Sequence, residues 1–188
     1  MKKIGLAIFG LVAFAISAAA EPFYHEFNEW REYHQHWLAV CPVYKGEYDI
    51  AGKACWATTY SGPKAGFGRR NQVRVFRDKD TGEQSIEFAV LWSDWDSSQD
   101  MVLRFQGGET YELGQDRISA DPQVANTYNV SDPALVSELL NLMKRKNFMY
   151  LHMPLVGEPI ETAPYSLMGF SDANQFLADF AQGNPKAR

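Results

Sequence analysis

Apolar and polar residues alternate over short stretches along most of this chain, and this period of two predicts β-strands with one buried face. Val73 and Val75 alternate with arginines before a turn-forming segment, 78–82, and a second apolar run, 85–92. This order predicts an antiparallel hairpin. Further strands are expected at residues 37–43, 54–60, 101–105, 110–113, 148–153 and 165–168.

Helical spacing of apolar residues occurs at three places. A short N-terminal helix is predicted from Phe23, Phe27, Trp30 and Trp37, which are spaced near three and four. Two helices are predicted late in the chain, at 131–146 and from Ser171 onward. No repeat or linker divides residues 21–188. The pattern therefore predicts one mainly β domain, an antiparallel β-sandwich or curled sheet with helices at its edge.

The first twenty residues have the pattern of a secretory signal peptide. Lys2 and Lys3 precede an uncharged apolar run, 4–16, and small residues follow up to Ala20. Cleavage near Ala20 would deliver a bacterial protein to the periplasm or the exterior. The apolar run is shorter than the roughly 20 residues that span a bilayer, and no later segment reaches that length. We therefore expect no transmembrane segment in the mature chain, 21–188.

The two cysteines, Cys41 and Cys55, both follow the predicted cleavage site. Two thiols in an oxidising compartment are expected to form one disulfide bond. The chain-entropy model assigns roughly 3 kcal/mol of stabilisation to a closed loop of about 15 residues.

Composition excludes some classes of protein. The chain has 188 residues, of which 46% are hydrophobic and 22% charged, and its formal net charge is -5. These values are typical of a folded globular domain rather than of a disordered chain. A nucleic-acid binder would need a basic stripe, so we expect no nucleic-acid partner.

One polar set could bind a metal ion. His25, Glu29, Glu32 and His36 are spaced by four, three and four, which would place them on one face of the predicted N-terminal helix. Two imidazoles and two carboxylates could hold Zn²⁺ or another divalent metal. The alternative is that they form the solvated face of an amphipathic helix.

Basic residues cluster around one loop and the strand after it. The set could contact an anionic partner, because Arg suits phosphate and carboxylate groups. The alternative is the wet face of a strand. The cluster consists of Lys64, Arg69, Arg70, Arg74 and Arg77.

A third polar segment has the alternate spacing of the first ligands in a calcium loop. It contains Asp94, Asp96, Ser98 and Asp100. The glycine and glutamate that complete such a loop are missing, so a solvated loop is the alternative. No catalytic motif was found in the sequence, and no cofactor is predicted from it.

The mature chain resembles the invasion-associated locus B family of exported bacterial proteins. Residues 163–173 resemble that family's closing Tyr-Ser-Leu-x-Gly-Phe-Ser/Thr-x-Ala element, and residues 139–146 its basic-ended helix. Cys55-Trp56, with Trp37 and Cys41 ahead, is similar to its cysteine pattern. The resemblance implies a compact β-rich domain and carries over no activity, catalytic residue or cofactor.

These observations predict an exported non-catalytic domain that acts in the periplasm or at the cell surface through protein or envelope contacts. Two alternatives remain. One is a metal-binding protein or metal-dependent hydrolase that uses the His25, Glu29, Glu32 and His36 set. The other is a carrier of a small ligand in an aromatic-lined cleft of the sheet.

Overall fold

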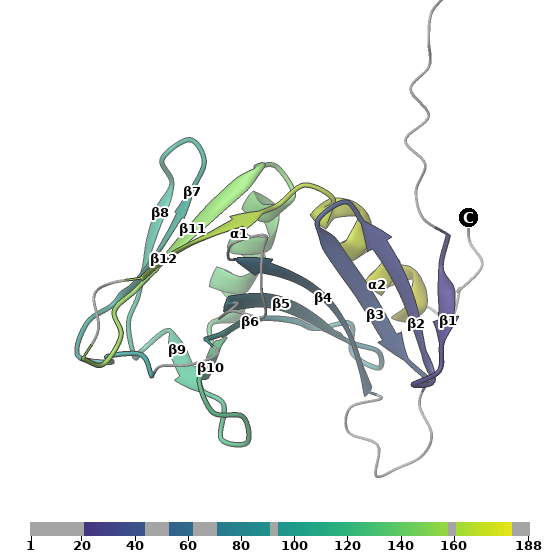
Figure 1. Cartoon of the computed structure of the whole chain (residues 1–188), viewed down its shortest axis with the longest axis horizontal. Coiled ribbons are helices and arrows are strands. Elements are labelled where there is room, and N and C mark those ends of the chain that lie inside the picture. Colours follow the sequence, from purple (N-terminus) through teal and green to yellow (C-terminus); the bar gives the residue numbers. More distant parts are fainter. Residues whose placement is uncertain (1–20, 44–52, 62–70, 91–93, 158–160, 182–188) are drawn as a thin grey trace, which may run out of the picture.

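The computed structural model describes residues 21–43, 53–61, 71–90, 94–157 and 161–181. Within these ranges the chain forms two antiparallel sheets (Figure 1). The larger has the spatial order β1 (Phe23–His25), β2 (Glu29–His34), β3 (Trp37–Pro42), β4 (Ala54–Ser61), β5 (Asn71–Asp78), β6 (Gln84–Ala89), β10 (Thr127–Val130) and β9 (Ile118–Ala120). The smaller has the order β12 (Glu161–Ser166), β11 (Phe148–Met153), β7 (Met101–Phe105) and β8 (Thr110–Leu113). The prediction of a mainly β, antiparallel fold is confirmed.

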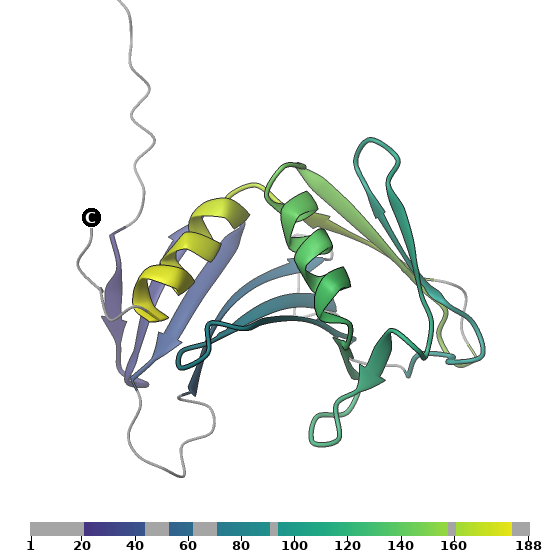
Figure 2. The same ribbon diagram turned by 180° about the vertical axis from the view of Figure 1, so that it is seen from behind.

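Two helices, α1 (Pro133–Met143) and α2 (Phe170–Ala181), occur late in the described part of the chain, as the apolar spacing predicted. Helix α2 packs on strands β2 to β5, and α1 packs on β6 and β10. Both helices lie in front of the strands in the view from behind (Figure 2), which places them on the same side of the large sheet. Helix α1 begins at Pro133, two residues later than predicted, because Asp132 is its N-cap: the Asp132 side chain accepts a hydrogen bond from the amide of Ala134 at 2.9 Å.

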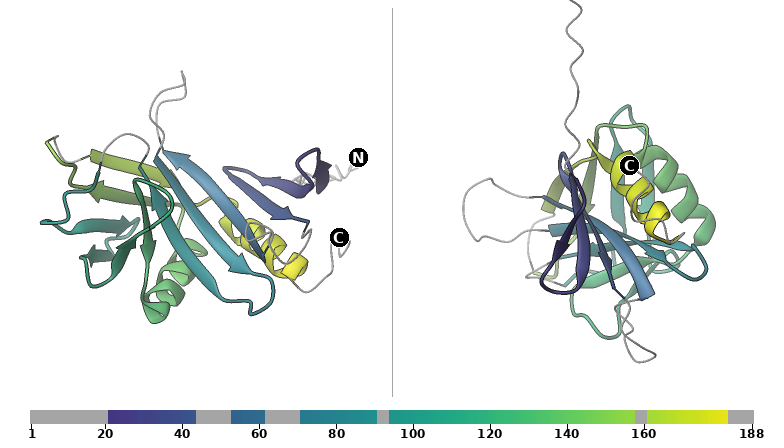
Figure 3. Two further views of the ribbon diagram at one scale, coloured as in Figure 1. Left: turned by 90° about the horizontal axis from the view of Figure 1, so that it is seen from below. Right: turned by 90° about the vertical axis from the view of Figure 1, so that its right-hand side faces the viewer.

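Strand alternation gives the large sheet two different faces. The inner face, which we define as the face under the helices, carries buried residues such as Ala57, Val73, Val75 and Phe88. These belong to a core cluster that also includes residues of both helices and of the smaller sheet. The opposite face, called the outer face below, is covered by neither described helix (Figure 3).

The predicted N-terminal helix is wrong. Residues 23–34 form β1 and β2, a hairpin whose turn places Asn28 at φ 57°. Trp30 and His34 point to the inner face, where their rings lie 6.1 Å and 6.2 Å from those of Phe180 and Phe176 in α2. Aromatic and polar side chains occur on both faces of this hairpin. The apolar–polar alternation of a strand is therefore not visible in this part of the sequence, and the spacing of its aromatic residues by three and four favoured a helix.

The hairpin predicted around residues 78–82 is confirmed. Strands β5 and β6 pair in antiparallel register, and the turn between them contains Gly82 at φ 74°. The Asp78 side chain accepts hydrogen bonds from the amides of Asp80 and Thr81 at 2.8 Å and 2.7 Å. These hydrogen bonds hold the pKa of Asp78 below its usual value, and the bond from the Thr81 amide has the largest effect.

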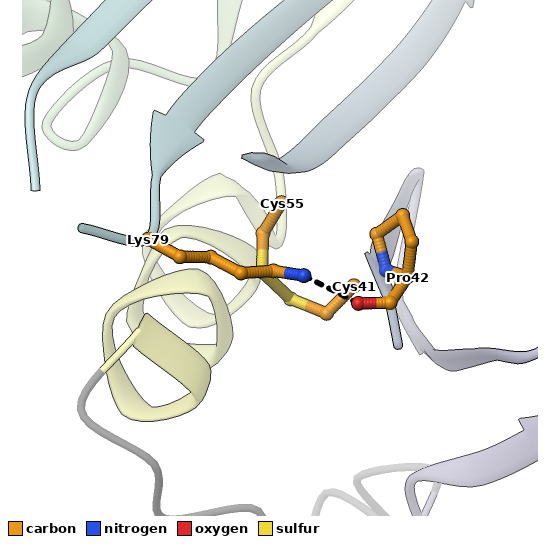
Figure 4. The surroundings of a disulfide bond; sticks show 4 residues. All are labelled: Cys41, Pro42, Cys55 and Lys79. Carbon is orange, nitrogen blue, oxygen red and sulfur yellow. Dashed lines mark hydrogen bonds between the residues drawn. A yellow bond between two sulfur atoms is a disulfide. The ribbon is translucent and has the colours of Figure 1, made fainter. Parts of the chain in front are cut away.

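The predicted disulfide between Cys41 and Cys55 is present, with the two sulfur atoms 2.13 Å apart (Figure 4). It joins β3 to β4 on the inner face. Beside it, the Nζ atom of Lys79 donates a hydrogen bond to the carbonyl of Pro42, which ties the turn after β5 to the end of β3. Neither described helix has the length and apolar character that a membrane span requires.

Candidate binding groove on the outer face

The pairing of β4 with β5 brings three pairs of side chains together on the outer face. Trp56 lies opposite Phe76, Thr58 opposite Arg74, and Tyr60 opposite Gln72. Since side chains alternate along a strand, these point away from the core that their neighbours form with the helices.

These side chains surround a shallow cavity of about 300 Å³, which we call the β4–β5 groove. This volume lies at the lower end of the range for small-molecule sites, roughly 300–1,000 Å³. The rings of Trp56 and Phe76 have their centroids 6.4 Å apart and are tilted by 43°. Tyr60 is 46% exposed. The groove is lined by Ala54, Trp56, Thr58, Tyr60, Gln72, Arg74 and Phe76.

Thr58 is the unusual member of the groove. Its side chain lines the cavity, the residue is only 5% exposed, and its Oγ1 atom has no hydrogen-bond partner within the described part of the chain. Buried hydroxyl groups are nearly always hydrogen-bonded, and one left without a partner costs about 1–3 kcal/mol. Because the Oγ1 atom is itself shielded from solvent, this cost falls on the stability of the fold rather than on ligand binding.

The charge of Arg74 is balanced by a carboxylate on the neighbouring strand β6. Its Nε atom forms an ion pair with Oε1 of Glu87, a side chain of β6 that is 7% exposed. Burial raises the pKa of Glu87, the nearby Arg74 opposes this change, and Asp121 adds to it. The guanidinium of Arg74 also lies 6.0 Å from the ring centroid of Phe76. The groove thus combines aromatic and neutral hydrogen-bonding groups around a paired cation.

The structure does not gather the predicted basic cluster into one patch. Arg74 points to the outer face, whereas Arg77 lies opposite Cys55 and so on the inner face. Lys64, Arg69 and Arg70 lie outside the described residues.

The predicted metal set is not brought together either. The carboxylate of Glu29 forms an ion pair with Arg31, while Glu32 points to the other face of β2. The Nδ1 atom of His36 lies 2.5 Å from Oγ of Ser166, a contact that joins the turn after β2 to the end of β12.

His25 lies on β1, in register with Glu29. Nowhere in the described ranges do three or more His, Cys, Asp or Glu side chains form a group suited to a metal ion. The metal hypothesis depended on a helix that would place the four side chains on one face. The chain forms strands there instead, and strand alternation puts Glu29 and Glu32 on opposite faces.

The segment with calcium-loop spacing forms a local turn. The carboxylate of Asp96 accepts hydrogen bonds from the amide and hydroxyl of Ser98 and from the side-chain amide of Gln99. These bonds, that of the Ser98 hydroxyl foremost, lower the pKa of Asp96. The geometry agrees with the alternative interpretation of a solvated loop.

Most of the groove was not identified from the sequence. The sequence predicts 54–60 as a strand, but among the lining residues it names only Arg74 as a candidate for binding, and Trp56 only as part of the cysteine pattern. The available signal was the alternation of Trp56, Thr58 and Tyr60 with smaller residues. It could not show which face was outer, because apolar residues occur on both faces of β4.

Comparisons with known proteins leave the chain unassigned. No protein-family model matches it. Searches of curated proteins and of solved structures also find no significant match. The resemblance of residues 163–173 and of the cysteine pattern to the invasion-associated locus B family therefore remains a prediction.

Proposed function

We propose that this chain is an exported non-catalytic binding domain that acts in the periplasm or at the cell surface. Its partner, an envelope component or a protein, is held in the β4–β5 groove. The observation that carries the proposal is the cavity on the outer face, which Trp56, Tyr60 and Phe76 line together with the polar side chains of Gln72 and Arg74.

The groove has the composition of a binding surface. Aromatic residues are enriched at interaction sites because they bury a large area at little cost in conformational entropy. Tyr60 and Gln72 add polar groups that can orient a partner. The described lining residues include no carboxylate, imidazole or thiol that could act as a general base, which favours binding over catalysis.

Two features support the proposed cellular location. The predicted signal peptide at 1–20 would direct export, and the Cys41–Cys55 disulfide suits an oxidising compartment. The resemblance to the invasion-associated locus B family points to the same location.

The proposal is tested by site-specific photo-crosslinking in intact cells. A photoreactive residue is placed at Gln72, in the groove, or at Ser137, which is exposed on α1 at the opposite side of the sheet. We expect an adduct of reproducible mass from position 72 only, and its loss when Trp56→Ala is added. Equal adducts from both positions, or none from position 72, would refute the groove as the binding site.

The adduct mass also separates the predicted alternatives. A mass increase of several kilodaltons or more would identify a protein partner. A smaller increase would identify a small ligand or a fragment of an envelope polymer, as expected for the carrier.

A further inference from the structure

We propose that the occupant of the β4–β5 groove is an uncharged saccharide unit of the cell envelope, with one face of its ring against Trp56 and Phe76. This inference rests on the proposed function and names the chemical class of the ligand.

The aromatic pair supplies the apolar half of such a site. Trp56 and Phe76 are adjacent across β4 and β5, both are partly exposed, and both line the groove. A sugar ring presents C–H groups on one face, and these pack against an aromatic ring while the hydroxyl groups at the ring edge remain free for hydrogen bonds. Burial of such apolar surface contributes roughly 25 cal/mol per Å².

The polar residues supply the other half. Tyr60 carries a hydroxyl that can donate and accept, and the amide of Gln72 does both. Sugar hydroxyl groups also donate and accept, so they can match this set. A purely hydrocarbon ligand would displace water from the Gln72 amide without replacing its hydrogen bonds.

Charge distinguishes an uncharged saccharide from an anionic ligand. The one cation among the described lining residues, Arg74, is already paired with the buried Glu87, and the carboxylate of Asp121 lies near enough to interact with it. An added phosphate or carboxylate would have to compete with these two acids for the guanidinium. An uncharged ligand can still accept a hydrogen bond from Arg74 without breaking the ion pair.

Size sets the length of the recognised unit. A cavity of about 300 Å³ at the low end of known ligand sites suits one or two rings. The groove lies on the open face of the sheet, so a longer polymer could continue beyond it.

The test uses the mature chain, residues 21–188, and defined probes. The chain is applied to an array of uncharged oligosaccharides that includes β-1,4-linked N-acetylglucosamine oligomers, glucans and mannans. Inorganic phosphate, phosphorylated monosaccharides and vesicles of phosphatidylglycerol serve as anionic probes. We expect binding to at least one uncharged saccharide and none to the anionic probes.

Affinity for that saccharide is then measured by calorimetry for matched variants. Trp56→Ala should weaken binding at least tenfold, and Trp56→Phe, which keeps an aromatic ring, should restore most of it. Tyr60→Phe, which removes only the hydroxyl, should weaken binding up to about tenfold, since a neutral hydrogen bond contributes that much at most. Ser137→Ala on α1 should leave affinity unchanged, and circular dichroism checks that each variant is folded.

The outcomes separate the inference from the proposed function. Binding only to anionic probes, or to no saccharide on the array, would overturn the saccharide assignment. A crosslink from position 72 would then still support a binding groove with a different occupant. Loss of that crosslink as well would overturn both.

Discussion

Replacing Thr58 by Val should stabilise the protein, although it removes a polar group from the groove. Val has nearly the same shape as Thr and the same preference for strands. The substitution eliminates a buried hydroxyl whose oxygen has no hydrogen-bond partner in the described structure, and it adds a buried methyl group in its place.

The magnitude follows from that loss. An unsatisfied buried hydroxyl costs about 1–3 kcal/mol, so relief of even the lower value should raise the free energy of unfolding by roughly 1 kcal/mol. For a chain of this size, 1 kcal/mol corresponds to an increase in Tm of about 2–4 °C. Thermal unfolding followed by circular dichroism and urea unfolding followed by tryptophan fluorescence both measure this change.

The adjacent residue provides a matched control. Thr59 points to the inner face, and its hydroxyl donates a hydrogen bond to the carbonyl of His36 at 2.9 Å. Thr59→Val leaves that carbonyl without its partner and should destabilise the protein by about 1–3 kcal/mol. The reasoning fails if Thr58→Val lowers Tm, or if both substitutions change Tm in the same direction.

Three further predictions concern stability. Gly169→Ala should lower the free energy of unfolding by more than about 3 kcal/mol, because φ is 90° and a Cβ there would lie 2.0 Å from the carbonyl oxygen of His34. Gly108→Ala, with φ 106° and no atom within 4 Å of the added Cβ, should lower it by only about 1–3 kcal/mol through backbone strain. Equal losses of Tm in the two variants would contradict this. Cys41→Ser should lower the free energy of unfolding by roughly 3 kcal/mol, measured in urea, and added reductant should then change only the wild type. The pKa of Asp78 is lower in the folded than in the unfolded chain, so its ionised carboxylate stabilises the fold above the unfolded value of 3.8, and this stabilisation is lost as the pH falls below that value. Asp78→Asn should therefore reduce the dependence of Tm on acid pH, and an unchanged dependence would disprove this.

The parts of the fold that depend on local pattern were predicted well. The hairpin around residues 78–82 follows from a run of turn-forming residues between two alternating stretches, and α1 and α2 follow from stripes of apolar residues at helical spacing. The disulfide followed from having two cysteines in a chain with an apparent export signal. None of these needs knowledge of residues distant in the sequence.

The candidate site depended on distant residues and was largely missed. Glu29 and Glu32 were placed together on a helix, but β1 and β2 form a hairpin whose inner face is defined by α2, about 140 residues later in the chain. Similarly, Arg74 and Arg77 were grouped by sequence proximity and are separated by strand alternation. Periodicity alone could not assign these faces, because each carries both apolar and polar residues.

The sequence by itself determined the element types over most of the described chain, the antiparallel architecture and the cysteine pairing, because these depend on side-chain period, turn chemistry and the number of cysteines. Only the tertiary structure decided which face of the large sheet is open. Both described helices pack on the side of Val73 and Val75, and this leaves Trp56, Thr58 and Phe76 around the groove. A strand with two partly apolar faces can bury either one, and the choice is made by what packs against it.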